Sequence, residues 1–146
     1  MSAVRDLVGV ELGPTAWQEI TQKRIDGFAE ATGDAQWIHT DPVRAAAGPF
    51  GTTIAHGYLT LSLCASLLFE VLQLDGVGLT VNYGVNRVRF PAPVPVGSSV
   101  RGRFTVVSVD DVAGGEQAVI AATVERKGAD KPVCVAELVL RFLQSA

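Results

Sequence analysis

The sequence has few cysteines, few aromatic residues and little charge of either sign. Only 2 of its 146 residues are cysteine, which excludes the cysteine-dense framework of a small disulfide-stabilised protein. Cys64 lies in an apolar stretch and Cys134 in a strand-like one, so we expect two buried, reduced thiols. Charged residues make up 18% of the chain, the net charge is -3, and no long basic run occurs. Nucleic acid and anionic membrane surfaces are therefore not expected as partners.

A long uninterrupted apolar run is also missing. Polar side chains interrupt the longest apolar stretch, residues 58–74, and residues 1–13 lack the basic opening and apolar segment of a signal peptide. We therefore expect a soluble, cytoplasmic protein with no membrane partner. The length suits a single domain over residues 1–146, with one substantial core.

Helical patterns fill the chain before Gly76. Thr21 is a typical N-cap for a helix over Gln22–Thr32, and Gly33 predicts where that helix ends. The Asp41-Pro42 pair predicts the cap and first residue of a short helical turn. Residues 58–69 are apolar on nearly every side, which predicts a central helix enclosed by the rest of the fold.

Strand patterns follow Gly76. Four segments rich in Val, Ile, Phe and Thr are separated by Pro, Gly or Asp clusters: residues 79–90, 99–109, 117–127 and 133–143. The prolines of residues 91–95 predict an extended crossing between the first two strands, with no ladder between them. The sequence thus predicts an α+β fold, a curved antiparallel sheet wrapped around a central buried helix.

The loop of residues 33–42 carries the most informative polar pair. Asp34 and His39 lie five residues apart, and His39 is one of only two histidines. A carboxylate and an imidazole so placed suit acid/base chemistry on one water molecule. Trp37 and Ile38 make the loop partly apolar, so we expect a desolvated carboxylate. The structural alternative is that Asp34 bonds to loop amides after a helix end and that His39 only packs.

These residues resemble the MaoC-like, or R-specific enoyl-CoA hydratase, family of the hot-dog fold. The similarity spans most of the chain and is most specific at Phe28-Ala29, Gly33-Asp34, His39, Asp41-Pro42, Phe50, residues 54–57 and Leu59. The commoner family pattern has Asn where this chain has Gln36 and Pro where it has Trp37. These departures resemble the branch that includes nodulation protein N. We expect the bulk of Trp37 to narrow the acyl pocket and to favour short chains.

The resemblance implies a hydro-lyase of fatty acid metabolism that adds water reversibly to a trans-2-enoyl thioester and gives the R-3-hydroxyacyl thioester. It implies a homodimer, an acyl-CoA or acyl-carrier substrate, and no cofactor. Asp34 and His39 would be the catalytic pair, and the Gly57 amide would stabilise the enolate-like oxygen. Ser62 would face the active site, and Gln36 would keep the amide hydrogen bonds of the usual Asn.

Other readings of the same residues stay open. Ser62 is equally suited to a back-bond to its own helix, and His56 is expected to cap or brace the central helix. A metal site is not expected, because His39 and Asp41 lack a third ligand at convincing spacing. A thioesterase on the same scaffold, or an acyl-CoA or acyl-carrier binding protein without catalysis, are the alternative functions.

Overall fold

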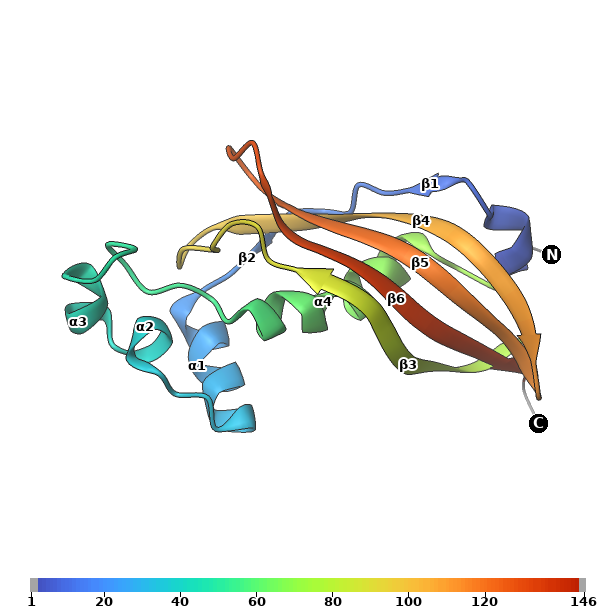
Figure 1. Ribbon diagram of the computed structural model, residues 1–146, viewed down its shortest axis with the longest axis horizontal. Helices are drawn as coiled ribbons and strands as arrows, with labels where there is room; N and C mark the ends of the chain where they lie inside the picture. The colour runs from blue at the N-terminus through green and yellow to red at the C-terminus, as the bar shows by residue number, and fades with distance from the viewer. Residues whose placement is uncertain (1–2, 145–146) are drawn as a thin grey trace.

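The computed structural model describes residues 3–144 and shows a curved antiparallel sheet packed against one long helix (Figure 1). That helix, α4 (Gly57–Val71), lies along the concave face of the sheet. Three shorter helices, α1 (Gln22–Thr32), α2 (Trp37–Thr40) and α3 (Pro42–Ala46), gather at one end of the molecule. The 3-10 turn η1 (Val4–Leu7) lies at the opposite end. The predicted α+β architecture is confirmed.

Four long strands form most of the sheet: β3 (Val77–Arg89), β4 (Ser99–Val112), β5 (Gly115–Arg126) and β6 (Pro132–Gln144). The strand order is β1-β4-β5-β6-β3, so β3 pairs with the last strand and not with β4. The proline-rich segment between β3 and β4 therefore crosses without a ladder, as predicted. All four long strands were predicted, although each differs from its predicted bounds by a few residues.

The core lies between α4 and the inner face of the sheet. Leu67 and Leu68 of α4 are 0% exposed, and inward residues of β4 and β5 such as Phe104 and Ile120 are buried against the same cluster. Side chains alternate between buried and partly exposed along β4 and β5, as a sheet with one covered face requires. Cys64 and Cys134 join this core as free, buried thiols, as expected. Hydrogen bonding to Cys134, together with burial, raises the pKa of the Cys64 thiol.

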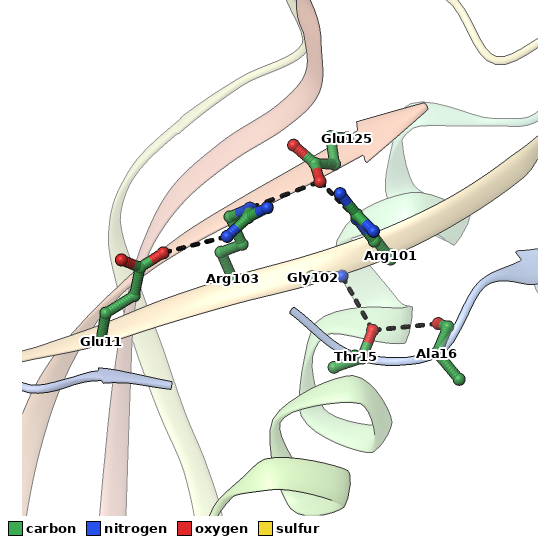
Figure 2. Close-up of polar contacts among 7 residues, drawn as sticks. All are labelled: Glu11, Thr15, Ala16, Arg101, Gly102, Arg103 and Glu125. Atoms are coloured by element: carbon green, nitrogen blue, oxygen red, sulfur yellow. Dashed lines mark hydrogen bonds and ion pairs between the residues drawn. The ribbon is translucent and has the colours of Figure 1, made fainter. Parts of the chain in front are cut away.

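The chain before α1 contributes two short strands that the sequence did not predict. β1 (Glu11–Leu12) and β2 (Gln18–Glu19) both pair with β4. Between them, the Thr15 hydroxyl accepts from the Gly102 amide at 3.0 Å and donates to the Ala16 carbonyl (Figure 2). The predicted total of four strands is therefore too low, because strands of two residues show no alternation from which they can be read.

Charged side chains reinforce this attachment of the N-terminal segment. Arg103 lies between two carboxylates, 3.2 Å from Glu11 and 3.3 Å from Glu125, and Arg101 also bonds Glu125 (Figure 2). The guanidinium of Arg101 stacks 4.2 Å from the centre of the Trp17 ring. The two arginines hold the pKa of the Glu125 carboxyl below its ordinary value of 4.5, with the Arg101 hydrogen bond as the largest cause.

The other edge of the sheet is open. β3 pairs only with β6 among the described strands, and nearly all of its side chains are exposed. Large apolar residues are among them, with Leu79 51%, Tyr83 58% and Val85 47% exposed.

Within residues 3–144, no helix is both long and apolar enough to cross a membrane.

Candidate active site

Helix α1 and the turn after it form as the sequence predicts. The Thr21 hydroxyl accepts from the Arg24 amide at 3.2 Å, and Gly33 ends the helix with a φ of 81°, a conformation that favours glycine. The following loop contains one helical turn, α2, where the sequence predicted only a loop. The Asp41 carboxylate then caps α3 by accepting from the Arg44 amide at 3.0 Å. These caps determine the direction in which the Asp34–His39 segment runs.

His39 is buried and its ring is fixed. Its side chain belongs to α2 and is 6% exposed. Nδ1 lies 2.7 Å from the carbonyl oxygen of Ile54. Because a carbonyl only accepts hydrogen bonds, Nδ1 must carry the hydrogen in this contact. In the neutral imidazole, Nε2 therefore keeps a lone pair with which it can accept a proton.

The second histidine packs against the first. The rings of His56 and His39 are stacked, with centroids 3.8 Å apart and an angle of 22° between their planes. His56 Nε2 donates to the Asp34 carbonyl at 2.8 Å. Although His56 is the N-cap residue of α4, its side chain makes no capping bond. The predicted capping of the central helix by His56 is therefore wrong, because its side chain bonds the Asp34 loop and the first amides of α4 have no side-chain cap.

Asp34 comes close to both imidazoles. A carboxylate oxygen of Asp34 and one ring nitrogen each of His39 and His56 lie within 4.8 Å of one another. A water that bonds two partners at about 2.8 Å each spans about 4.5 Å between them. A separation of at most 4.8 Å between the Asp34 carboxylate and the His39 imidazole is compatible with one shared water. The expected desolvation of Asp34 is wrong for the single chain, because its side chain is exposed and Trp37 does not cover it.

The same three groups, Asp34, His39 and His56, are also possible metal ligands. A zinc ion lies in the plane of each coordinating imidazole at about 2.0–2.1 Å from the nitrogen. The His39 and His56 rings are nearly parallel and stacked, so their in-plane lone pairs do not meet at one ion. Each ring also uses one nitrogen in a carbonyl contact. This arrangement suits acid/base chemistry better than coordination.

Gly57 opens onto an apolar cavity at the start of α4. The cavity has a volume of about 280 Å³, and its lining includes Phe50, Ile54, Gly57, Thr60 and Phe90. A Cβ on Gly57 would lie 2.8 Å from the Phe90 ring, so only glycine fits beneath this aromatic side chain. Ile54 links the cavity to the imidazole, because its carbonyl accepts from His39. An apolar chain in this cavity would end near both the helix N-terminus and the acid/base pair.

The other predicted site residues lie further away. The Ser62 hydroxyl donates to the Tyr58 carbonyl at 2.7 Å and borders a second cavity of about 230 Å³ between α4 and β3. The Gln36 side chain is exposed, while its carbonyl accepts from the His39 amide at 3.0 Å. Asp34 and His39 lie together, and Gly57 lines the cavity that Ile54 links to His39. The site roles of Ser62 and Gln36 stay predictions.

Trp37 packs on α3 and does not line the cavity at Gly57. A Cβ on Gly48 would lie 2.9 Å from its ring, and the Arg44 guanidinium stands 4.4 Å from the ring centre. Trp37 is not among the residues that line the cavity at Gly57, and its effect on the acyl pocket stays a prediction. The sequence analysis missed two residues that hold the site: Gln22 bonds the His39 carbonyl, and Thr53 bonds Gln22. No local motif distinguishes either residue.

The curved sheet, the helix along its concave face and the polar pair near the start of that helix define a protein of the hot-dog class, of the hydratase type. The MaoC like domain family matches residues 5–130, and the chain belongs to this family. The 3-hydroxyacyl-thioester dehydratase Z of Mycobacterium tuberculosis (strain ATCC 25618 / H37Rv) is 54% identical over 136 residues, covering 92% of this chain and 90% of the relative.

Two further relatives agree with this assignment. Nodulation protein N of Rhizobium leguminosarum bv. viciae is 43% identical over 140 residues, covering 93% of this chain and 86% of that protein. The solved structure of an (R)-hydratase from A. caviae involved in PHA biosynthesis matches with a TM-score of 0.76 and 26% identity, covering 92% of this chain and 96% of that one. The resemblance to the family and to its nodulation protein N branch is confirmed.

Proposed function

We propose that this protein is a hydro-lyase that adds water reversibly to trans-2-enoyl thioesters and forms the R-3-hydroxyacyl thioester. The observation that carries the proposal is the Asp34 carboxylate within 4.8 Å of an imidazole nitrogen, beside a His39 ring fixed with Nδ1 bonded to Ile54. The names of the relatives support the reaction class, since they are a 3-hydroxyacyl-thioester dehydratase and an (R)-hydratase.

The proposed reaction uses one water. His39 Nε2 takes a proton from the water as its oxygen bonds to C3, and the double-bond electrons move toward C2 and the thioester oxygen. The resulting imidazolium gives a proton to C2, so that the H and OH of one water are added. Asp34 holds the other hydrogen of the water and stabilises the imidazolium. Positioned acid/base groups of this kind contribute about 10² to 10⁴ in rate.

Gly57 would act on the thioester carbonyl. The carbonyl oxygen gains negative charge as the enolate-like state forms, and an N–H at a helix N-terminus lowers the energy of such an oxygen. The side chain of His56 leaves the first amides of α4 without a cap, which keeps this position open to a substrate. The acyl chain would lie in the cavity lined by Phe50 and Phe90.

The test is to incubate the purified protein with crotonyl-CoA and to follow the absorbance of the conjugated double bond. Loss of the double bond, with an R-3-hydroxybutyryl product by chiral analysis, is the expected result. Release of free thiol with the double bond intact would instead identify a thioesterase. Tight binding of crotonyl-CoA with neither change would identify a binding protein. The corresponding acyl-carrier thioester, assayed in parallel, decides which carrier is preferred.

We propose that the working form is a homodimer joined along β3. An unpaired edge of 13 residues with exposed apolar side chains favours pairing with another strand. Phe90, directly after β3, packs against Gly57, so a second copy at this edge would border the cavity. We expect Val85→Asp to give a monomer by sedimentation, whereas Val107→Asp, at an equally exposed position on β4, should stay dimeric. Wild-type protein that sediments as a monomer would contradict this assembly.

The two buried free thiols also agree with a reducing compartment, and we propose the cytoplasm as the location. The substrate chemistry requires no redox group or metal, so we propose that the enzyme works without a cofactor. The described sheet and its one core further support a single MaoC-like unit over the whole chain.

A further inference from the structure

Gln22, the first residue of α1, makes a bridge between two segments that hold His39. Its Nε2 donates to the His39 carbonyl oxygen at 2.7 Å and to the Asp26 carboxylate at 2.9 Å. Its Oε1 accepts from the Thr53 hydroxyl at 2.6 Å. Both donor hydrogens and the acceptor of the amide are thus in use, which fixes the side chain in one orientation.

The bridge closes a ring of hydrogen bonds around His39. Thr53 directly precedes Ile54, whose carbonyl accepts from His39 Nδ1 at 2.7 Å and whose amide donates to the Ile38 carbonyl at 3.0 Å. Gln22 therefore contacts the backbone that carries the imidazole and, through Thr53, the backbone that orients it. Thr53 is 1% exposed and His39 is 6% exposed, so water is poorly placed to replace a lost contact.

We propose that Gln22 and Thr53 are positioning residues for His39. The inference rests on the proposed acid/base role of His39. By fixing the separation of α2 from residues 53–54, the amide bridge keeps the hydrogen on Nδ1 and keeps Nε2 free to accept a proton. Neither Gln22 nor Thr53 lines the cavity at Gly57, so their loss should slow the chemical step and leave substrate binding nearly unchanged.

The variants separate the bridge from general packing. Gln22→Met keeps the length of the side chain and removes all three hydrogen bonds, and Thr53→Val removes only the hydroxyl. Thr53→Ser keeps the hydroxyl. Gln18→Met is the matched control, because the Gln18 amide is also bonded at both ends, and its partners, Glu70 and Arg24, lie outside α2.

The expected kinetic result is a fall in kcat with little change in KM. Displacing a catalytic group by about 1 Å costs on the order of 10²-fold, so we expect about 10- to 100-fold for Gln22→Met and about tenfold for Thr53→Val. KM for crotonyl-CoA should stay within about twofold, as expected when only transition-state interactions are lost. Thr53→Ser and Gln18→Met should both stay within about twofold of the wild-type kcat.

A second readout needs no turnover. The ¹⁵N chemical shifts of the imidazole report which nitrogen carries the hydrogen, and His39 should change from Nδ1–H in the wild type to a mixture in Gln22→Met and Thr53→Val. An unchanged kcat in both variants, an equal loss in Gln18→Met, or lost activity with an unchanged His39 tautomer would each overturn the proposal. If Gln22→Met does not fold, Thr53→Val against Thr53→Ser decides. A wild-type chain without hydratase activity would refute the proposed function, while the tautomer shift would still test the bridge.

Discussion

His39 and Asp34 belong to the same short loop, yet the fold holds them differently. The His39 ring and carbonyl have hydrogen-bond partners in other segments, its amide donates to the Gln36 carbonyl within the loop, and the side chain is buried. Asp34 is exposed, and it is its backbone carbonyl, not its carboxylate, that His56 binds. The difference indicates that the fold orients the imidazole in advance, whereas no described side chain holds the Asp34 carboxylate in place.

The largest combined effect on activity and stability is expected at His39, whose ring the fold holds in place. His39→Gln should lower kcat/KM by about 10² to 10⁴, because it removes the proton acceptor. It should also cost about 1–3 kcal/mol of unfolding free energy, since the buried Ile54 carbonyl loses its donor. Hydration of crotonyl-CoA and urea unfolding measure the two losses. A variant that loses stability but keeps its activity would show that His39 is only structural.

Asp34→Asn tests the exposed member of the Asp34–His39 pair. We expect a similar loss of activity, about 10² to 10⁴, with no measurable change in stability, because the carboxylate makes no hydrogen bond with another described side chain. Asp75→Asn, which changes an exposed carboxylate away from the site, should leave both quantities unchanged. A large loss of stability in Asp34→Asn would mean that the carboxylate is held by the fold after all.

Much of this arrangement was readable from the sequence, because local signals fix local structure. Thr21 and Gly33 delimit α1, Asp41 caps α3, and residues 58–69 are mostly apolar, so these helices could be placed. β1 and β2 were missed because they are too short to show a pattern and exist only by pairing with the β4 backbone.

The site was predicted only in part, and the missing part is nonlocal. The Asp34–His39 pairing follows from a spacing of five residues and from family resemblance. Gln22 bonds His39, which lies 17 residues further along the chain, and Thr53, which lies 31 residues further. No sequence pattern indicates these two contacts. The exposure of Asp34 and the packing of Trp37 against Gly48 also depend on tertiary placement, which the apolar character of a loop does not reveal.

Gly57→Ala changes the N-terminus of α4 and leaves the side chains of Asp34 and His39 unaltered, so it tests the proposed role of the Gly57 amide separately. The added Cβ would lie 2.8 Å from the Phe90 ring and must displace either the ring or the start of α4. We expect kcat/KM to fall about tenfold or more as the amide moves away from the substrate carbonyl. Gly27→Ala in α1 is the control, because a Cβ there meets nothing within 4 Å. Recovery in Gly57→Ala with Phe90→Leu would confirm steric displacement, and full activity in Gly57→Ala alone would refute the role.

The smallest effect is expected at a carboxylate that, unlike Asp34, the fold holds firmly. Glu125 is bonded by Arg101 and Arg103, and its pKa is lowered from 4.5. A lowered folded-state pKa stabilises the protein above the unfolded value, and that stability is lost as the pH falls through the folded value. Glu125→Gln should therefore cost at most about 1 kcal/mol at pH 7, and the difference should shrink below pH 4.5. Urea unfolding of the wild type and Glu125→Gln at several pH values measures this difference in unfolding free energy. A difference that grows as the pH falls would contradict the prediction.

The central claim is that Asp34 and His39 act on the same water, and a double-mutant cycle tests it most directly. kcat/KM for crotonyl-CoA hydration is measured for the wild type, Asp34→Asn, His39→Gln and the double variant. Residues that work as one unit lose their effect together, so the double variant should be about as slow as the slower single variant. Losses that multiply would show that the two side chains act independently and would contradict the shared water.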